Sequence, residues 1–148
     1  MRYARSTFEA EDMLQVGFIK VFRSMDSYRG EGSFEGWIRR IMVNTAIETY
    51  RRNMRSGQHT EIDEVHDDVQ RTFAMDTLEC EDLLRVIQTL PDGYRIVFNM
   101  YALEGFSHKE IAEALQISEG ASKSQLSRAR AWLKEKIKQL EGGTYEPR

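Results

Sequence analysis

The residues best suited to chemistry are basic and hydroxyl side chains near the end of the chain. They lie between residues 118 and 130 and are Ser118, Lys123, Ser124, Ser127, Arg128 and Arg130. Lysine and arginine neutralise phosphates, and serine hydroxyls form hydrogen bonds with phosphates or base edges. This group of donors predicts the non-covalent recognition of nucleic acid.

Two predicted helices position these side chains. The first follows Ser107, and Glu110 stands three residues later, as in a capping box. Residues 116–118 form a turn, and Ser118 can cap a longer second helix. The inward positions of the two helices are Ile111, Ala112 and Leu115, and then Leu126, Ala129 and Leu133. This pattern is typical of a helix-turn-helix, which places its second helix in the major groove of DNA.

No arrangement of side chains suited to catalysis or metal binding is visible. The three histidines are scattered, and Cys80 has no partner cysteine. The paired carboxylates fall in an acidic stretch where solvation is the simpler explanation. His108 opens the first helix of the motif, where we expect a surface residue or a phosphate contact. We therefore expect no enzymatic activity, no metal ion and no cofactor.

Composition indicates a small helical protein. The chain has 148 residues, of which 41% are hydrophobic and 30% are charged, and only two are prolines. The single cysteine excludes an internal disulfide and favours a reducing compartment. No apolar run is long enough to span a bilayer, so we expect no membrane insertion.

The charge is unevenly distributed, although the net charge is only −3. Residues 1–55 hold ten basic and seven acidic residues, residues 56–82 hold one and nine, and residues 83–148 hold ten and eight. An acidic run with few apolar residues is typical of a solvated linker. We predict an all-α fold with a first domain at 1–55, an acidic linker at 56–76, a second domain at 77–141 and a tail at 142–148.

The first basic segment predicts two helices joined by a glycine-containing loop. One runs from Ser6 or Thr7 to about Met25, and the other from Phe34 to Met54. The stripe expected to be buried on the first helix is Leu14, Phe18, Val21, Phe22 and Met25. The inward positions of the second are Phe34, Trp37, Ile38, Ile41 and Thr45. For Phe18, Phe22 and Trp37 we favour core packing over ligand contact.

Polar positions on this second helix offer a basic surface, and the loop before it offers an aromatic side chain. Arginines and one asparagine occupy the outer faces of the helix, where phosphate contact is at least as well supported as solvation. Tyr28 stands beside Arg29 in the loop. Its ring could stack on an unpaired base or fold back to anchor the loop, and the sequence leaves both open.

The second half predicts two helices before the helix-turn-helix. One carries Leu78, Leu83, Leu84, Ile87 and Leu90 on its apolar face and stops near residue 91. Pro91 is well placed to start the next helix, which continues to a stop at residue 105.

These pieces together resemble a bacterial extracytoplasmic-function sigma factor of the sigma-70 type, over nearly the whole chain. Residues 12–15 and 18–22 resemble region 2.2, and residues 27–34 and 37–41 resemble regions 2.3 and 2.4. Residues 90–98 resemble the start of region 4. Residues 111–112, 118–120, 123–124 and 128–130 resemble region 4.2.

The resemblance implies a transcription initiation factor that works in the bacterial cytoplasm at the nucleoid. Its partners would be core RNA polymerase, through the β′ clamp and β flap, promoter DNA and an anti-sigma factor. Polymerase contacts are implied for Asp12, Gln15, Val16 and Lys20. Minus-10 contacts are implied for Tyr28, Arg29, Gly30, Ser33, Phe34, Arg39, Arg40, Asn44, Arg51 and Arg52. Minus-35 contacts are implied for the six donors of the helix-turn-helix named above.

The sequence departs from the family pattern in two places. The family has a helix before the position of Arg2, and here we expect only its end, so the apolar stripes of the first domain would be partly exposed or covered by another copy. The residue after Gln15 is usually acidic, and here it is Val16. Because Val16 lies off the predicted buried stripe, we expect it to be exposed.

Two other functions stay open. The chain could be a stand-alone regulator that uses the same helix-turn-helix without polymerase. It could also be a sigma fragment that interacts but does not initiate, because of the missing helix. Tight, sequence-specific duplex binding by the chain alone would indicate the regulator, and loss of core binding would indicate the fragment.

Replacing Val16 by glutamate tests the second departure. We expect Val16→Glu to strengthen binding to core polymerase by about 0.2–1 kcal/mol, because it restores one interface charge pair. Fluorescence anisotropy with labelled protein measures this affinity, and an unchanged affinity would show that no such pair forms.

Overall fold

The computed structural model describes residues 2–57 and 80–142. All regular secondary structure in these ranges is helical, which confirms the predicted all-α class. The chain divides into two compact units, at residues 3–59 and 60–148. Most of the predicted acidic linker, the tail at 143–148 and the apolar position Leu78 lie outside the described residues, and the predicted domain boundaries stay a prediction.

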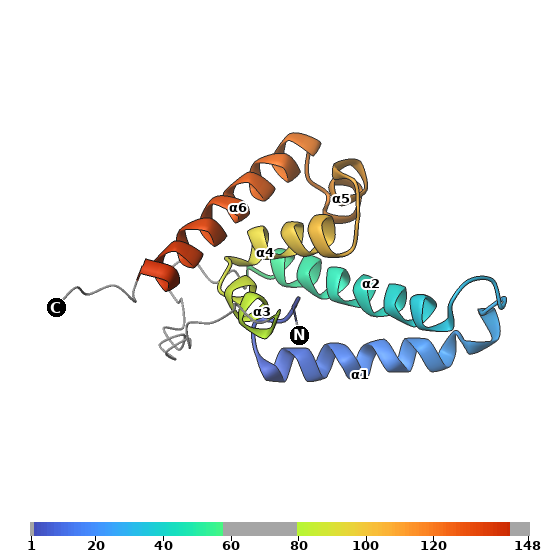
Figure 1. The fold of residues 1–148 in the computed structure, drawn as a ribbon. Coiled ribbons are helices and arrows are strands. Elements are labelled where there is room, and N and C mark those ends of the chain that lie inside the picture. The colour runs from blue at the N-terminus through green and yellow to red at the C-terminus, as the bar shows by residue number, and fades with distance from the viewer. Residues whose placement is uncertain (1, 58–79, 143–148) are drawn as a thin grey trace. The chain divides into compact units, whose positions relative to one another are not determined.

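The first unit is a helical hairpin. Helix α1 spans Thr7–Arg23, a short 3-10 turn follows at Met25–Ser27, and α2 spans Phe34–Arg55. Each helix begins at a serine whose hydroxyl accepts a backbone N–H: Ser6 from Glu9 at 3.1 Å, and Ser33 from Gly36 at 3.0 Å. The two helices run side by side in opposite directions (Figure 1).

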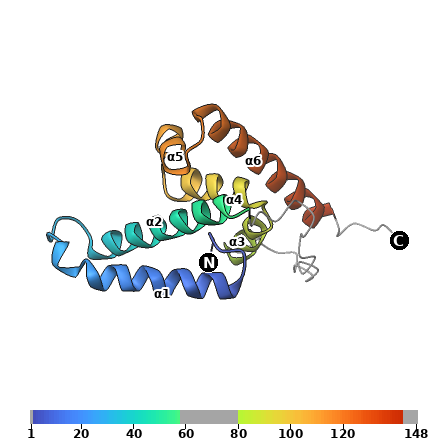
Figure 2. The ribbon, with the colours of Figure 1, turned by 180° about the vertical axis from the view of Figure 1, so that it is seen from behind.

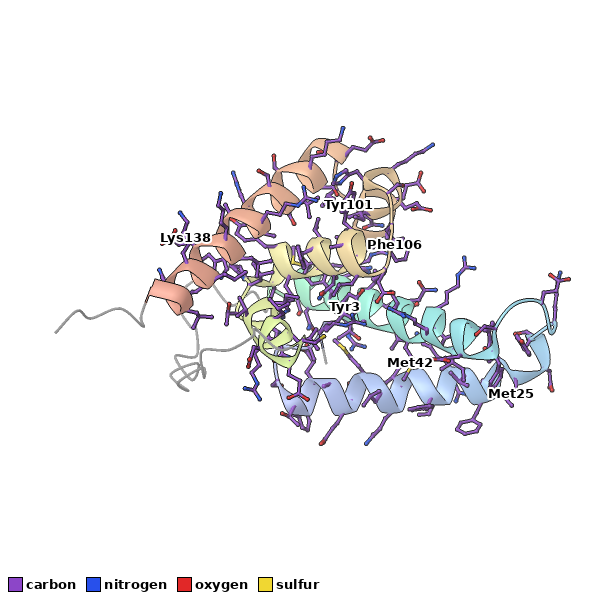
Figure 3. The ribbon with its side chains drawn as sticks, viewed as in Figure 1. Tyr3, Met25, Met42, Tyr101, Phe106 and Lys138 are labelled. Atoms are coloured by element: carbon purple, nitrogen blue, oxygen red, sulfur yellow. The ribbon has the colours of Figure 1, made fainter. Side chains whose placement is uncertain are left out.

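Small residues on α1 let the two helices approach closely. Ala10, Gly17 and Val21 are the buried residues of α1. The side chain of Met42 on α2 lies over Gly17, so close that a Cβ added there would be 2.1 Å from Met42 Sδ. Met42 is labelled between the two helices in Figure 3. The glycine therefore sets the contact distance in this part of the hairpin.

The burial predicted for the stripe of α1 is wrong except at Val21, whereas the expectation that this stripe is partly exposed agrees with the structure. Leu14, Phe18 and Phe22 are 45%, 46% and 72% exposed, and Met25 is also exposed. The helix packs instead through the neighbouring face, where the small residues admit the closest approach of α2. On α2, Thr45 is buried as predicted, Trp37, Ile38 and Ile41 are half-buried and Phe34 is exposed.

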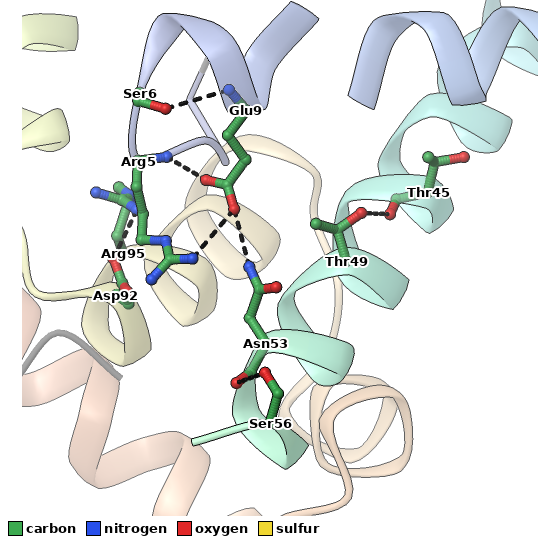
Figure 4. Close-up of polar contacts among 9 residues, drawn as sticks. All are labelled: Arg5, Ser6, Glu9, Thr45, Thr49, Asn53, Ser56, Asp92 and Arg95. Carbon is green, nitrogen blue, oxygen red and sulfur yellow. Dashed lines mark hydrogen bonds and ion pairs between the residues drawn. The ribbon is translucent and has the colours of Figure 1, made fainter. Parts of the chain in front are cut away.

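Polar contacts join the start of α1 to the end of α2. The Glu9 carboxylate accepts the Arg5 backbone N–H at 2.6 Å and the Asn53 side-chain amide at 2.8 Å. Within α2, the hydroxyl of Thr49 donates to the Thr45 carbonyl at 3.0 Å (Figure 4). The carboxylate of Glu9 thereby fixes the register of the two helices at their joined end.

Within residues 80–142, the second unit packs four α-helices and one π-helical turn. The elements are α3 (Cys80–Gln88), α4 (Asp92–Phe98), the turn η2 (Asn99–Leu103), α5 (His108–Leu115) and α6 (Glu119–Gly142). One core cluster buries Ile87, Leu90 and Ala129, with Trp132 packed against it. Gly105 follows the π turn at φ +77°, as a glycine stop requires.

Two further details of this unit bear on the predictions. Leu83 was expected on the apolar face of α3, but it is 39% exposed, because α3 packs through its adjacent positions. The guanidinium of buried Arg95 in α4 donates to Asp92 at 2.8 Å (Figure 4). None of the described helices is long and apolar enough to cross a membrane.

Alanine at Gly17 of α1 and at Gly36 of α2 separates packing from helix propensity. We expect Gly17→Ala to lower the free energy of unfolding by about 1–3 kcal/mol, because its Cβ displaces Met42 from the interface. Gly36→Ala meets only Ser33 atoms at 3.6 Å and beyond, so it should raise that free energy by about 0.4–1 kcal/mol. Urea unfolding followed by circular dichroism measures both.

The double variant with Met42→Ala supplies the control. Removing the Met42 side chain should relieve the clash, so Gly17→Ala should cost much less in that background. An equal cost in both backgrounds would show that the contact between Gly17 and Met42 does not limit the helix spacing.

Candidate nucleic-acid interface

A capping box starts α5, as the sequence predicted. The Ser107 hydroxyl accepts the Glu110 backbone N–H at 3.1 Å, and the Glu110 carboxylate accepts the Ser107 N–H at 2.7 Å. The backbone N–H of Ser107, and then its hydroxyl, hold the pKa of Glu110 below its ordinary value of 4.5. Ile111, Ala112 and Leu115 are buried beneath this start.

A left-handed residue makes the turn between the two helices. Gln116 has φ +57°, and the next N–H, of Ile117, donates to the Ala112 carbonyl at 3.1 Å. The Ser118 hydroxyl then accepts the Ala121 N–H at 3.0 Å and starts α6. The predicted turn and cap are confirmed, and Figure 2 shows α5 and α6 leaving it at an angle to each other.

Helix α6 divides cleanly into a buried and an exposed side. Ser122, Leu126 and Ala129 are buried against the unit. All six predicted minus-35 residues are exposed: Ser118, Lys123, Ser124, Ser127, Arg128 and Arg130. The structure therefore presents these donors on the open surface of one helix, as major-groove recognition requires.

A polar and aromatic chain behind α6 was missed by the sequence reasoning. His108 Nδ1 lies 2.8 Å from the Ser122 hydroxyl, and the His108 ring stacks on Tyr101 with centroids 4.6 Å apart. The Arg130 guanidinium lies 5.8 Å from the centroid of the Tyr101 ring. His108 is half-buried rather than a simple surface residue, because its ring joins α5 to α6, and the predicted phosphate contact stays a prediction. No sequence spacing signals a contact fourteen residues apart.

The loop between α1 and α2 is anchored by Tyr28. Its hydroxyl donates to the Gly32 carbonyl at 2.9 Å, and its ring centroid lies 5.2 Å from Phe34 and 5.4 Å from Trp37. Gly30 and Gly32 have φ of +72° and +76°. Of the two roles left open for Tyr28, the geometry is that of the loop anchor. Arg29 and Ser33 are exposed beside it.

The remaining predicted minus-10 residues lie on α2. Arg39, Arg40, Asn44 and Arg52 are exposed, whereas Arg51 is half-buried and its Nε is buried without a hydrogen-bond partner. Helical spacing places Arg40 and Asn44 on one face, with Arg39 and Arg52 to either side. Helix α2 therefore carries several exposed basic side chains, and exposed Glu48 lies among them.

The predicted polymerase contacts lie on α1. Asp12, Gln15 and Val16 are exposed, the last as the sequence predicted. Lys20 is half-buried and forms an ion pair with Glu48 of α2, which the sequence did not indicate. Exposed apolar side chains accompany these positions, with Phe8 82% and Ile19 51% exposed.

Within residues 2–57 and 80–142, no three histidine, cysteine or acidic side chains lie close enough together to hold a metal ion. Cys80 is a free, exposed thiol at the start of α3.

The capping box predicts a pH dependence of stability. Because the folded-state pKa of Glu110 is lowered, its contribution is present above the ordinary value and is lost as pH falls through the folded-state pKa. We expect the stability difference between the wild type and Glu110→Gln to shrink as pH falls from 6 to 3. Urea unfolding at stepped pH measures it. Glu113→Gln on the same helix is the control, and a parallel trend in both variants would contradict the assignment.

Comparisons with known proteins agree with this geometry. Residues 1–56 match the family model of sigma-70 region 2, and residues 80–133 match that of sigma-70, region 4. An ECF RNA polymerase sigma-E factor of Haemophilus influenzae is 33% identical, over 87% of this chain and 75% of that protein. The one from Escherichia coli K12 is 28% identical, over 89% of this chain and 75% of that protein.

A solved structure shows the same fold. It is the sigma factor RpoE in complex with the anti-sigma factor NepR from Bartonella quintana, with a TM-score of 0.56 and 23% identity. The match covers 93% of this chain and 86% of that one. The two family matches, the shared fold and the capped helix-turn-helix together show that the chain belongs to the extracytoplasmic-function (ECF) sigma factors. These are the transcription initiation factors that direct RNA polymerase to promoters.

Proposed function

We propose that this chain recognises a promoter with both of its units, reading the minus-35 element through α6 and the minus-10 element through the α1–α2 loop and α2. The observation that carries the proposal is the exposed set of donors on a capped helix-turn-helix. Six donors converge on α6, and its opposite side is buried. A buried side fixes the orientation of the helix, so the donors meet DNA in a defined register.

In the proposed minus-35 site, some donors of α6 would contact bases and others would contact phosphates. The first turns of a recognition helix contact base edges. Lys123 and Ser124 lie in those turns and would read bases, as would Ser118 at the cap. Arg128 lies further along the helix and would contact the backbone. Arg130 is held over Tyr101, so its guanidinium is oriented before DNA arrives.

The proposed minus-10 site would use a loop whose conformation is fixed by its own aromatic side chains. Tyr28, Phe34 and Trp37 contact one another, and the hydroxyl of Tyr28 closes the loop on Gly32. This leaves the exposed ring face of Phe34 and the side chain of Arg29 at the surface. Both can stack on an unpaired base. The arginines and asparagine of α2 would hold the phosphates of the opened strand.

Core polymerase would bind α1, with Asp12 and Gln15 on the β′ clamp, and the second unit would meet the β flap. The RpoE relative was solved with an anti-sigma factor, and we propose such a regulator for this chain as well. The protein would act in the bacterial cytoplasm at the nucleoid, with no catalysis of its own. The stand-alone regulator is the second candidate, because the helix-turn-helix by itself suits either function.

The test combines the chain with core RNA polymerase and a promoter fragment. Asp12→Ala with Gln15→Ala should raise the dissociation constant for core at least tenfold, or about 1.4 kcal/mol. Glu35→Ala, an exposed change on α2, should leave it unchanged. Lys123→Ala with Arg128→Ala should spare core binding and abolish promoter selection by the holoenzyme.

The stand-alone regulator predicts the opposite result, in which DNA binding does not depend on core polymerase. Tight, sequence-specific duplex binding by the free chain, with no detectable core complex, would overturn the proposal in favour of the stand-alone regulator. Core binding without promoter selection would leave only the interaction role of a sigma fragment.

A further inference from the structure

A basic ridge runs along α6 beyond the predicted minus-35 residues. It consists of Lys123, Ser127, Arg130, Lys134 and Lys138. Their spacings of four, three, four and four residues place all five on one face of the helix. All five are exposed. The ridge therefore starts among the proposed DNA contacts and continues for two further turns.

The ridge is turned away from the core of its unit. The buried side chains of α6 include Leu126 and Ala129, which lie about 80° and 140° around the helix from the middle of the ridge. Lys138 is labelled on the outer side of α6, away from α4 and α5, in Figure 3. Among the side chains that the structure describes, no carboxylate forms an ion pair with Lys123, Lys134 or Lys138.

The same helix contains a lysine that does not belong to the ridge. Lys136 is half-buried, and its ammonium group lies 5.8 Å from the ring centroid of Trp132. Its charge is engaged with an aromatic face on the core side of α6. Within the part of the chain that the structure describes, Lys134 and Lys138 contact no aromatic ring in this way, so their environment differs from that of Lys136.

The length of the ridge decides what it can reach. At 1.5 Å per residue, Lys134 lies about 16 Å and Lys138 about 22 Å along the axis from Lys123. The major groove of B-DNA is about 12 Å wide. If the turns around Lys123 occupy the groove, the two distal lysines fall at or beyond the phosphate strand that borders it.

We propose that Lys134 and Lys138 bind the phosphate backbone of the duplex that flanks the minus-35 element. This site rests on the proposed function, because it needs the start of α6 to lie in the groove. It would anchor the helix without reading sequence, since phosphate contacts set position and base contacts set specificity.

The chemistry of the ridge favours DNA over an acidic protein surface. Protein interfaces centre on buried aromatic or aliphatic anchors and are depleted in lysine. The ridge has no aromatic side chain, and its members are lysines, one arginine and one serine. A linear array of cations along one helix matches a phosphate strand, which carries one charge every 3.4 Å or so.

The experiment measures promoter binding by the holoenzyme over a range of salt concentrations. Lys134→Gln with Lys138→Gln should weaken binding at every salt concentration and reduce the slope of log K against log salt by about 1.8, or about 0.9 for each lost contact. Discrimination between promoter and mutated minus-35 elements should not change. Lys136→Gln, on the core side of the same helix, should leave the slope unchanged, and circular dichroism verifies that all variants fold.

Two further experiments distinguish a failure of the distal lysine site from a failure of the proposed minus-35 function. Of two promoter fragments, each truncated at one edge of the minus-35 element, one should bind the wild type and the double variant equally, because it lacks the phosphates that the distal lysines contact. Lys123→Gln with Arg128→Gln should lose discrimination, and if it does not, the proposed minus-35 function fails.

If that variant loses discrimination while Lys134→Gln with Lys138→Gln keeps the full salt slope, the distal site is wrong and the proposed function stands. A defect of the distal double variant that arises only when another protein is added would also overturn it, in favour of a protein-binding ridge.

Discussion

The burial of one side of α6 is the constraint on which the second unit depends. Ala129 is fully buried and contributes to the same cluster as Ile87 and Leu90, so the helix that completes the core is also the helix that presents the donors. A side chain larger than alanine at this position would move the whole helix, because cores are packed to crystal-like density. The packing of Ala129 therefore determines both the position of α6 and the direction in which its exposed donors face.

A polar contact refines what the apolar packing sets. Ser122 is fully buried on α6, and among the described hydrogen bonds its hydroxyl has the ring of His108 as partner. Leaving that hydroxyl unpaired would cost about 1–3 kcal/mol, so α5 and α6 hold their angle partly to keep the bond. Tyr101 stacks on a face of the same ring and contacts Arg130. The turn geometry is thus linked to the orientation of Arg130, one of the arginines proposed to contact DNA.

Local signals in the sequence were sufficient to predict where helices begin and end. They were insufficient to predict which helix faces pack against each other. The capping box at Ser107 and the cap at Ser118 involve residues within three positions, so their chemistry can be read directly from spacing. Periodicity also identified the exposed side of α6. It failed on α1, because an apolar face such as that of Phe18 and Phe22 shows what could be buried but not what covers it. The contact that pairs α1 with α2 depends on Gly17, where the signal is the absence of a side chain.

The exposed face of α1 carries apolar side chains beside its polar ones. Contiguous apolar surface is uncommon on proteins that act alone, and it marks interaction sites. Asp12 and Gln15 share the open side of the helix with Phe8 and Ile19. In a protein interface, buried apolar anchors provide most of the affinity, while polar groups provide register and rate of association. The valine at position 16 adds to the apolar part of such a surface. Exposed Val16 therefore offers apolar area at a position where an acidic residue would offer a charge.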